Sequence, residues 1–141
     1  MSDTSTSDTV NKVTFELASP EALLVSTTAD MVVVPGAEGD FGVLPGHAPF
    51  ISEVRPGVID VYQADRIEER VFVASGFAEV NEQGCTVLSN EAYPVDDLDR
   101  GDVQERLSAA QADLTDADSD HERDAAEKEI ILCTAMLEAI G

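Results

Sequence analysis

The chain has 141 residues, of which 29 are Asp or Glu and 8 are Lys or Arg, so its formal net charge at pH 7 is −21. Such a surface excludes binding to nucleic acid and to anionic lipid, because both require a cationic face. The apolar fraction of 43% is enough for a hydrophobic core, while no apolar run approaches the roughly 20 residues that span a bilayer, so direct lipid insertion is not expected.

The first ten residues are polar and acidic and offer little to bury. We predict that residues 1–10 are a disordered lead-in. The same segment lacks the basic region and the apolar stretch of a secretory signal, and it does not resemble a transit peptide.

Residues 11–95 are predicted to form a β-sandwich domain. Short apolar runs rich in β-branched residues alternate there with turn signals, a pattern typical of an all-β sandwich or barrel. The segment 81–84 predicts a tight hairpin between two of these runs. The predicted strands are 13–17, 22–25, 31–34, 51–54, 58–62, 71–74, 77–80 and 85–88.

Residues 96–141 are predicted to form an antiparallel α-helical hairpin, because apolar residues now recur every three or four positions. Asp97 or Asp99 is a candidate cap of the first helix, and Ser119 with Glu122 predicts a capping box for the second. With 14 acidic and 4 basic residues, we expect the hairpin to be less stable than the sandwich. The two apolar stripes are Val103, Leu107, Ala110 and Leu114, then Ala126, Ile130, Cys133, Leu137 and Ile140.

No catalytic constellation is found in the sequence. The glycine-rich stretch 36–42 carries carboxylates and no lysine, unlike a phosphate-binding loop. Neither a nucleophile–base pair nor a cluster of metal ligands stands out, and Cys85 and Cys133 are interpreted as buried small hydrophobes. We therefore expect no enzyme activity, no metal and no cofactor.

The segment 44–49, Leu-Pro-Gly-His-Ala-Pro, is the most unusual loop of the chain. Its two prolines and one glycine are expected to hold it in a fixed shape, because proline fixes φ and glycine supplies unusual angles. Two hypotheses remain open for His47. Its side chain either stabilises the turn through a local hydrogen bond or forms part of a docking surface.

The string 39–49, GDFGVLPGHAP, resembles the signature loop of the ε subunit of F-type ATP synthases, the subunit called δ in mitochondria. The order of the other segments agrees with this resemblance. Arg-Pro-Gly-Val follows at 55–58, Ala-Ser-Gly-Phe-Ala-Glu-Val at 74–80, and a two-helix tail at the end. The resemblance covers about residues 11–140.

The resemblance implies a flattened sandwich of about ten strands followed by the helical hairpin. It implies a non-catalytic central-stalk, or rotor, subunit of a proton-translocating F-type ATP synthase, peripheral to the cytoplasmic face of the bacterial inner membrane. In that role the sandwich links the γ subunit to the membrane c-ring and transmits rotation. Glu38, Asp40, Phe41 and His47 would then face the polar loops of the c-ring, which commonly carry arginine.

The tail departs from the family pattern. Members that bind ATP there resemble an (Ile/Leu)-Asp-x-x-Arg-Ala motif, whereas this chain has Leu-Asp-Arg-Gly-Asp-Val at 98–103. Because Asp102 replaces the arginine, we expect no nucleotide site. Asp99 and Arg100 would be the contributing residues if the altered motif functioned.

The tail of family members can also reach the α/β catalytic head and block hydrolysis. The acidity of this second helix opposes that contact, so we expect weak regulation at most. An alternative function is a free-standing module that senses a nucleotide or another small molecule.

Overall fold

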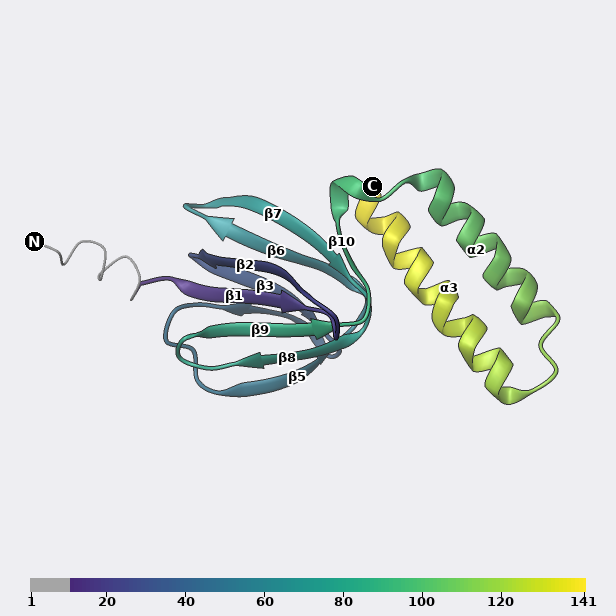
Figure 1. The fold of residues 1–141 in the computed structure, drawn as a ribbon, viewed down its shortest axis with the longest axis horizontal. Coiled ribbons are helices and arrows are strands. Elements are labelled where there is room, and N and C mark those ends of the chain that lie inside the picture. Colours follow the sequence, from purple (N-terminus) through teal and green to yellow (C-terminus); the bar gives the residue numbers. More distant parts are fainter. Residues whose placement is uncertain (1–10) are drawn as a thin grey trace, which may run out of the picture.

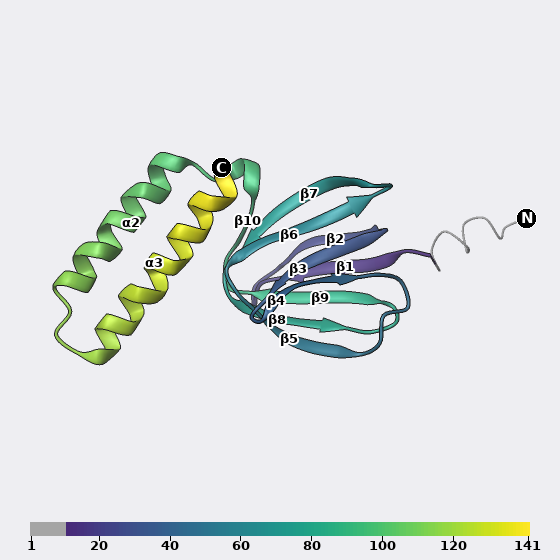
Figure 2. The ribbon, with the colours of Figure 1, turned by 180° about the vertical axis from the view of Figure 1, so that it is seen from behind.

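The computed structural model describes residues 11–141, so the predicted lead-in at 1–10 lies outside the described residues. Ten strands form one continuous sheet that curls on itself, and a hairpin of two helices stands beside one end of the curled sheet (Figures 1 and 2). This arrangement confirms the predicted class, a β-sandwich followed by an antiparallel helical hairpin.

The strands are β1 (Val13–Ala18), β2 (Leu23–Ala29), β3 (Met31–Gly36), β4 (Gly39–Val43), β5 (Phe50–Val54), β6 (Gly57–Gln63), β7 (Arg66–Val73), β8 (Gly76–Val80), β9 (Gly84–Ser89) and β10 (Ala92–Pro94). A short 3₁₀ helix, η1 (Val95–Asp97), leads to α2 (Arg100–Thr115) and α3 (Asp120–Ile140). Neither helix of the described chain is long and apolar enough to cross a membrane.

The strands follow the order β10-β7-β6-β3-β5-β8-β9-β1-β2, with β4 paired to β3. Neighbouring strands are antiparallel except β1 and β9, which run parallel. Alternate side chains of each strand point inward, so the curl encloses a core of valine, leucine, isoleucine and phenylalanine. Its largest fully buried members include Phe15, Leu17 and Ile59.

The strand β4 was missed by the sequence analysis. Glycines at 36, 39 and 42 weaken the strand signal, although Gly39–Val43 pairs with β3 through a tight turn that joins Gly36 to Gly39. A Cβ atom at Gly36 would lie 2.7 Å from the carbonyl oxygen of Gly39, so the turn requires glycine at that position. The turn exposes Glu38.

Both predicted helix caps are confirmed. Asp99 accepts a hydrogen bond from the backbone N–H of Asp102 at 3.0 Å, and Ser119 accepts one from Glu122 at 3.1 Å. The Glu122 carboxylate in turn accepts from the N–H of Asp118 at 2.8 Å. The first two of these bonds satisfy N–H groups that have no partner inside their helix.

A second hydrophobic core joins the hairpin to the sandwich. Phe72 points to the outer face of β7 and is fully buried beneath α3. The side chains of α3 that cover it form a stripe absent from the predicted one: Leu132, Met136 and Ala139. A single helical stripe does not predict these residues, because a helix that packs against two partners needs two adjoining apolar faces.

Candidate functional site

The loop between β4 and β5 contains a tight turn at Pro45 and Gly46. The N–H of His47 donates to the carbonyl oxygen of Leu44 at 3.2 Å, and Gly46 between them has a φ of +79°. Proline at the second position and a positive-φ glycine at the third are typical of a type II turn. His47 is therefore held in one place relative to β4.

Phe50, which sequence reasoning did not single out, connects Phe41 to His47. The rings of Phe41 and Phe50 meet edge to face with centroids 5.2 Å apart, and the His47 and Phe50 centroids are 6.3 Å apart. The Nδ1 atom of His47 also lies 2.6 Å from the carbonyl oxygen of Ala48. The local hydrogen bond is thus present, while the imidazole stays partly exposed at the end of an aromatic group.

Asp40 lies near the opposite end of β4 from His47, and an arginine already pairs with it. Arg55 donates from Nη2 to Asp40 Oδ1 at 2.6 Å and from Nη1 to the Gly36 carbonyl at 2.5 Å. The Asp40 side chain is nevertheless 60% exposed. A shallow groove of about 390 Å³ runs past Glu38, Asp40, Phe41 and Phe50. We call this surface, with His47 at its end, the β4–β5 groove.

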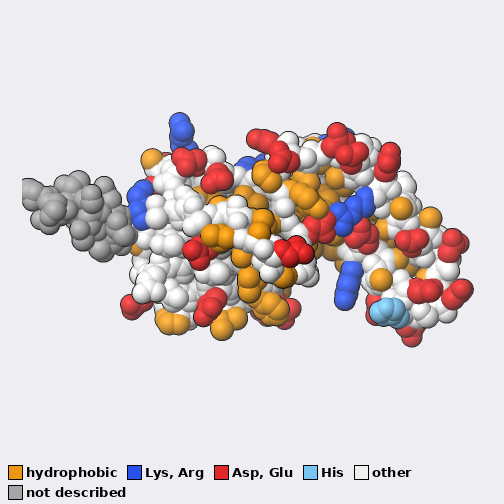
Figure 3. All heavy atoms as spheres, viewed as in Figure 1, with side chains coloured by type: hydrophobic (Ala, Val, Ile, Leu, Met, Phe, Trp, Pro, Cys, Tyr) orange, Lys and Arg blue, Asp and Glu red, His pale blue; other side chains and the backbone are white. Residues whose placement is uncertain are grey.

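A second candidate surface is apolar and lies on the outer face of β8, β9, β1 and β2. Four residues are paired in register across these strands: Phe77, Leu88, Ala18 and Leu23. Phe77, Leu88 and Leu23 are 59%, 53% and 58% exposed. Figure 3 shows hydrophobic side chains gathered on this side of the sandwich, near the hairpin. We call these four residues the apolar row.

The residues of the altered nucleotide motif do not form one site. The Asp99 side chain caps α2, and the Arg100 guanidinium contacts the backbone carbonyl oxygen of Gly141 on the other side of the hairpin. A pocket of about 220 Å³ at the start of α2 is lined by Asp97, Asp99 and Asp102, together with Arg106 and four apolar or aromatic side chains. Three carboxylates outnumber this arginine, which already pairs with Glu91 and Glu129, so the pocket is unsuited to a triphosphate.

Both thiols are buried; Cys85 lies among apolar side chains, whereas the Cys133 thiol also donates a weak hydrogen bond to Glu129 Oε2 at 3.9 Å. Burial raises the pKa of the Cys85 thiol to about 12 and also raises the pKa of the Cys133 thiol. A thiol must ionise to act as a nucleophile, so neither cysteine is set up as a reactive group in the folded chain.

The β-sandwich domain model of the ATP synthase delta/epsilon chain matches residues 12–95. The ATP synthase epsilon chain of Paramagnetospirillum magneticum is 51% identical over 130 residues, which cover 92% of this chain and 98% of that relative. The chain belongs to the ATP synthase delta/epsilon family. It is a non-catalytic subunit of the ATP synthase complex, as predicted. The epsilon chain of Rhodospirillum centenum is 50% identical over 136 residues, 93% of each chain.

The fold of this epsilon-type chain also matches a chain in a solved structure of the Euglena gracilis mitochondrial ATP synthase. The two share a TM-score of 0.79 at 20% identity, over 93% of this chain and 82% of the other. The match includes the hairpin as well as the sandwich, since the sandwich ends at Pro94. The comparisons give no support to the alternative of a free-standing sensing module.

Proposed function

We propose that this central-stalk subunit binds the γ subunit through the apolar row and contacts the c-ring loops through the β4–β5 groove. In this role it transmits rotation between the ring and the catalytic head. Its place is then peripheral, at the cytoplasmic face of the bacterial inner membrane. The observation that carries the proposal is the apolar row, an exposed apolar strip on the outside of a curled, well-packed sheet.

Several features support the γ contact. Phe77 and Leu88 face outward from the centre of the sheet, where no element of the described chain covers them. Burying such side chains in a stable interface is favourable, and interfaces of about 1,600 Å² in total are ordinary for a stable pair. The sheet beneath is closely packed, which suits a joint that must resist torsion.

Gel filtration of the full chain with its γ subunit at micromolar concentration tests this contact. We expect the two native proteins to co-elute, and Phe77→Asp to abolish co-elution because it places a charge in the buried centre of the interface. Ile131→Asp is the matched control, because Ile131 is also 59% exposed but lies on α3. Failure of the native chains to co-elute, or equal effects of the two substitutions, would contradict the γ contact.

The proposed c-ring contact rests on the β4–β5 groove. Glu38 and Asp40 give it negative charge, while the Arg55 pair and the turn at His47 hold its shape. A cationic ring loop would meet these carboxylates favourably, and such charges mainly fix orientation and register.

Replacement of Asp40 and His47 by alanine tests the ring contact. We expect the isolated chain to remain folded and the assembled synthase to lose ring cross-linking and coupled ATP synthesis. Asp60→Ala is the control, since Asp60 also pairs with an arginine, Arg70, but on β6 and β7. Normal coupling and unchanged cross-linking in the double variant would leave the groove with a purely structural role.

A further inference from the structure

We infer that Arg106 is the residue that fastens the hairpin to the sandwich in this chain, and that its bond to Glu91 sets how readily the hairpin opens. We call the set Arg106, Glu91 and Glu129 the Arg106 clasp. The inference rests on the geometry below and does not depend on the proposed partners.

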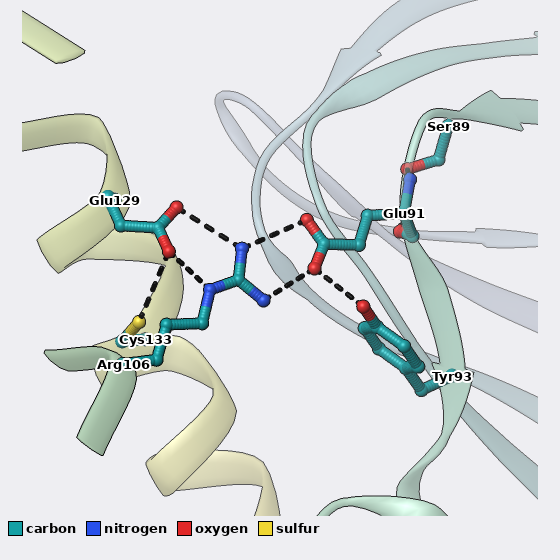
Figure 4. Close-up of polar contacts among 6 residues, drawn as sticks. All are labelled: Ser89, Glu91, Tyr93, Arg106, Glu129 and Cys133. Carbon is teal, nitrogen blue, oxygen red and sulfur yellow. Dashed lines mark hydrogen bonds and ion pairs between the residues drawn. The ribbon is translucent and has the colours of Figure 1, made fainter. Parts of the chain in front are cut away.

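One guanidinium holds two carboxylates from different parts of the fold (Figure 4). Arg106 of α2 donates from Nη1 to Glu91 Oε2 at 2.6 Å and from Nη2 to Glu91 Oε1 at 3.1 Å. It also donates from Nε and Nη2 to the two oxygens of Glu129 on α3. The Glu91 bonds cross between sandwich and hairpin, whereas the Glu129 bonds stay inside the hairpin.

The sandwich side of the clasp is held in position. Glu91 lies between β9 and β10, where the hydroxyl of the buried Ser89 accepts from the Glu91 N–H at 3.4 Å and donates to the Glu91 carbonyl at 3.0 Å. The Tyr93 hydroxyl donates to Glu91 Oε2 at 2.6 Å. Glu91 is therefore an anchored acceptor, and a bidentate arginine bond to an anchored carboxylate is among the stronger polar contacts.

The clasp is half-buried, since the side chains of Arg106, Glu91 and Glu129 are 35%, 24% and 34% exposed. Without the guanidinium, two half-buried carboxylates would face each other at the junction, and water would screen their repulsion only in part. The hairpin already carries 14 acidic and 4 basic residues. Loss of Arg106 therefore both removes a bond and creates repulsion between hairpin and sandwich.

The apolar contact of the hairpin with the sandwich is confined to one end. The residues that cover Phe72 come from the last half of α3 and the start of α2, while the opposite end of the hairpin projects away from the sheet (Figures 1 and 2). The first core contains no hairpin residue. The hairpin can therefore separate without disturbing the interior of the sandwich.

The two cysteines distinguish separation of the hairpin from unfolding of the whole chain. Cys133 is fully buried in the second core, next to the clasp, while Cys85 is buried in the first core. A thiol reagent reacts only when the thiol becomes exposed and ionises. Reaction of the full native chain with an aromatic disulfide reagent, with each cysteine assigned by mass spectrometry, thus separates hairpin opening from global unfolding.

We expect Cys133 to react faster than Cys85 in the native chain. Arg106→Gln and Glu91→Gln should each raise the Cys133 rate at least about tenfold, equivalent to about 1.4 kcal/mol, and leave the Cys85 rate unchanged. Arg123→Gln is the matched control, because Arg123 forms an ion pair with Asp120 within the first turn of α3. The control should leave both rates unchanged.

Two outcomes would overturn the inference. If Cys133 and Cys85 react at one common rate in every variant, the hairpin opens only with global unfolding. If Arg106→Gln accelerates Cys133 but Glu91→Gln does not, Arg106 acts inside the hairpin through Glu129 and does not fasten it to the sandwich. The slow Cys85 reaction serves in every variant as evidence that the sandwich remains folded.

Discussion

Gly76 on β8 lies closer to the next strand than any side chain would permit. A Cβ atom there would lie 1.9 Å from the carbonyl oxygen of Leu88, which is backbone and cannot rotate away. The close approach brings β8 and β9 together next to Phe77 and Leu88 of the apolar row. The position of the apolar row thus depends on residue 76 being glycine.

We expect Gly76→Ala to lower the free energy of unfolding by at least about 3 kcal/mol, because the strands must move apart to admit the methyl group. Gly42→Ala on β4 is the control, since its Cβ would meet only the flexible Met31 side chain at 3.5 Å. Urea unfolding measures both. Similar stabilities of the two variants would show that β8 and β9 adjust freely.

Glu91 makes stability depend on pH. The hydrogen bond from Arg106 is the largest cause that holds the pKa of this carboxyl below its ordinary value of 4.5. A carboxyl with a lowered folded-state pKa stabilises the fold fully above its unfolded pKa, and that stabilisation is lost as pH falls through the folded pKa.

The stability gap between the native chain and Glu91→Gln should therefore be largest near neutral pH and should shrink as pH falls through the lowered folded-state pKa of Glu91. Unfolding free energies of the two proteins, measured from about pH 7 to about pH 3, check this expectation. A gap that stays constant across the range would mean that the Glu91 charge does not contribute.

At the scale of elements, the sequence predicts the features that depend on neighbouring residues alone, such as helix caps and tight turns. The caps at Asp99 and Ser119 were predictable, because a short polar side chain followed by acidic residues has a direct physical role at a helix start. The rigid turn before His47 was predictable for a similar reason. The segment 39–43 was not, because its glycines hide a strand that exists through pairing with β3.

The candidate sites needed tertiary structure. Asp40 and His47 were named from the family resemblance, but Arg55 lies 15 positions from Asp40, and the contact of Phe50 with Phe41 crosses from β5 to β4. The Arg106 clasp joins residues 15 and 23 positions apart in the chain. Separations of 15 and 23 positions between helix, loop and strand follow no helical or strand period, so no sequence pattern indicates that these residues meet.

The hairpin covers part of the sandwich, so its removal should change how the sandwich behaves. We expect a fragment ending at residue 95 to fold, because the first core lies wholly within it, and to self-associate, because Phe72, Val58 and Ala74 lose their cover. Phe72→Gln in the fragment should restore the monomer, and Ile67→Gln, at an already exposed site on β7, should not. Gel filtration with light scattering measures this.

A fragment that fails to fold would show that the hairpin is part of the stability of the sandwich. A fragment that stays monomeric without substitution would show that Phe72 finds cover elsewhere. Circular dichroism of the fragment separates these two results from the expected one.

At the scale of the whole molecule, the tail has few free cations with which to bind the phosphates of a nucleotide. Three of its four cations are already engaged: Arg100 with the Gly141 carbonyl, Arg106 with two glutamates, and Arg123 with Asp120. The pocket at the start of α2 is lined by three aspartates and by Arg106, which already pairs with Glu91 and Glu129. A triphosphate would have to break existing contacts and overcome like charge.

We therefore expect millimolar ATP to leave the melting temperature of the full chain unchanged, since a ligand that binds the native state raises it by mass action. Asp102→Arg, which restores the arginine of the family motif, is the comparison. A shift for that variant and none for the native chain would tie the lack of binding to residue 102.

In the assembled synthase, the same charge and the closed clasp oppose entry of the tail into the catalytic head. Deleting residues 96–141 should then raise ATP hydrolysis by less than about threefold, or under about 0.7 kcal/mol in activation free energy. A synthase that carries the Glu91→Gln subunit is compared with the deletion, because this substitution is expected to loosen the hairpin without removing it. If deletion raises hydrolysis tenfold, or if Glu91→Gln lowers it strongly, then the freed hairpin does inhibit the head and the clasp is what restrains it.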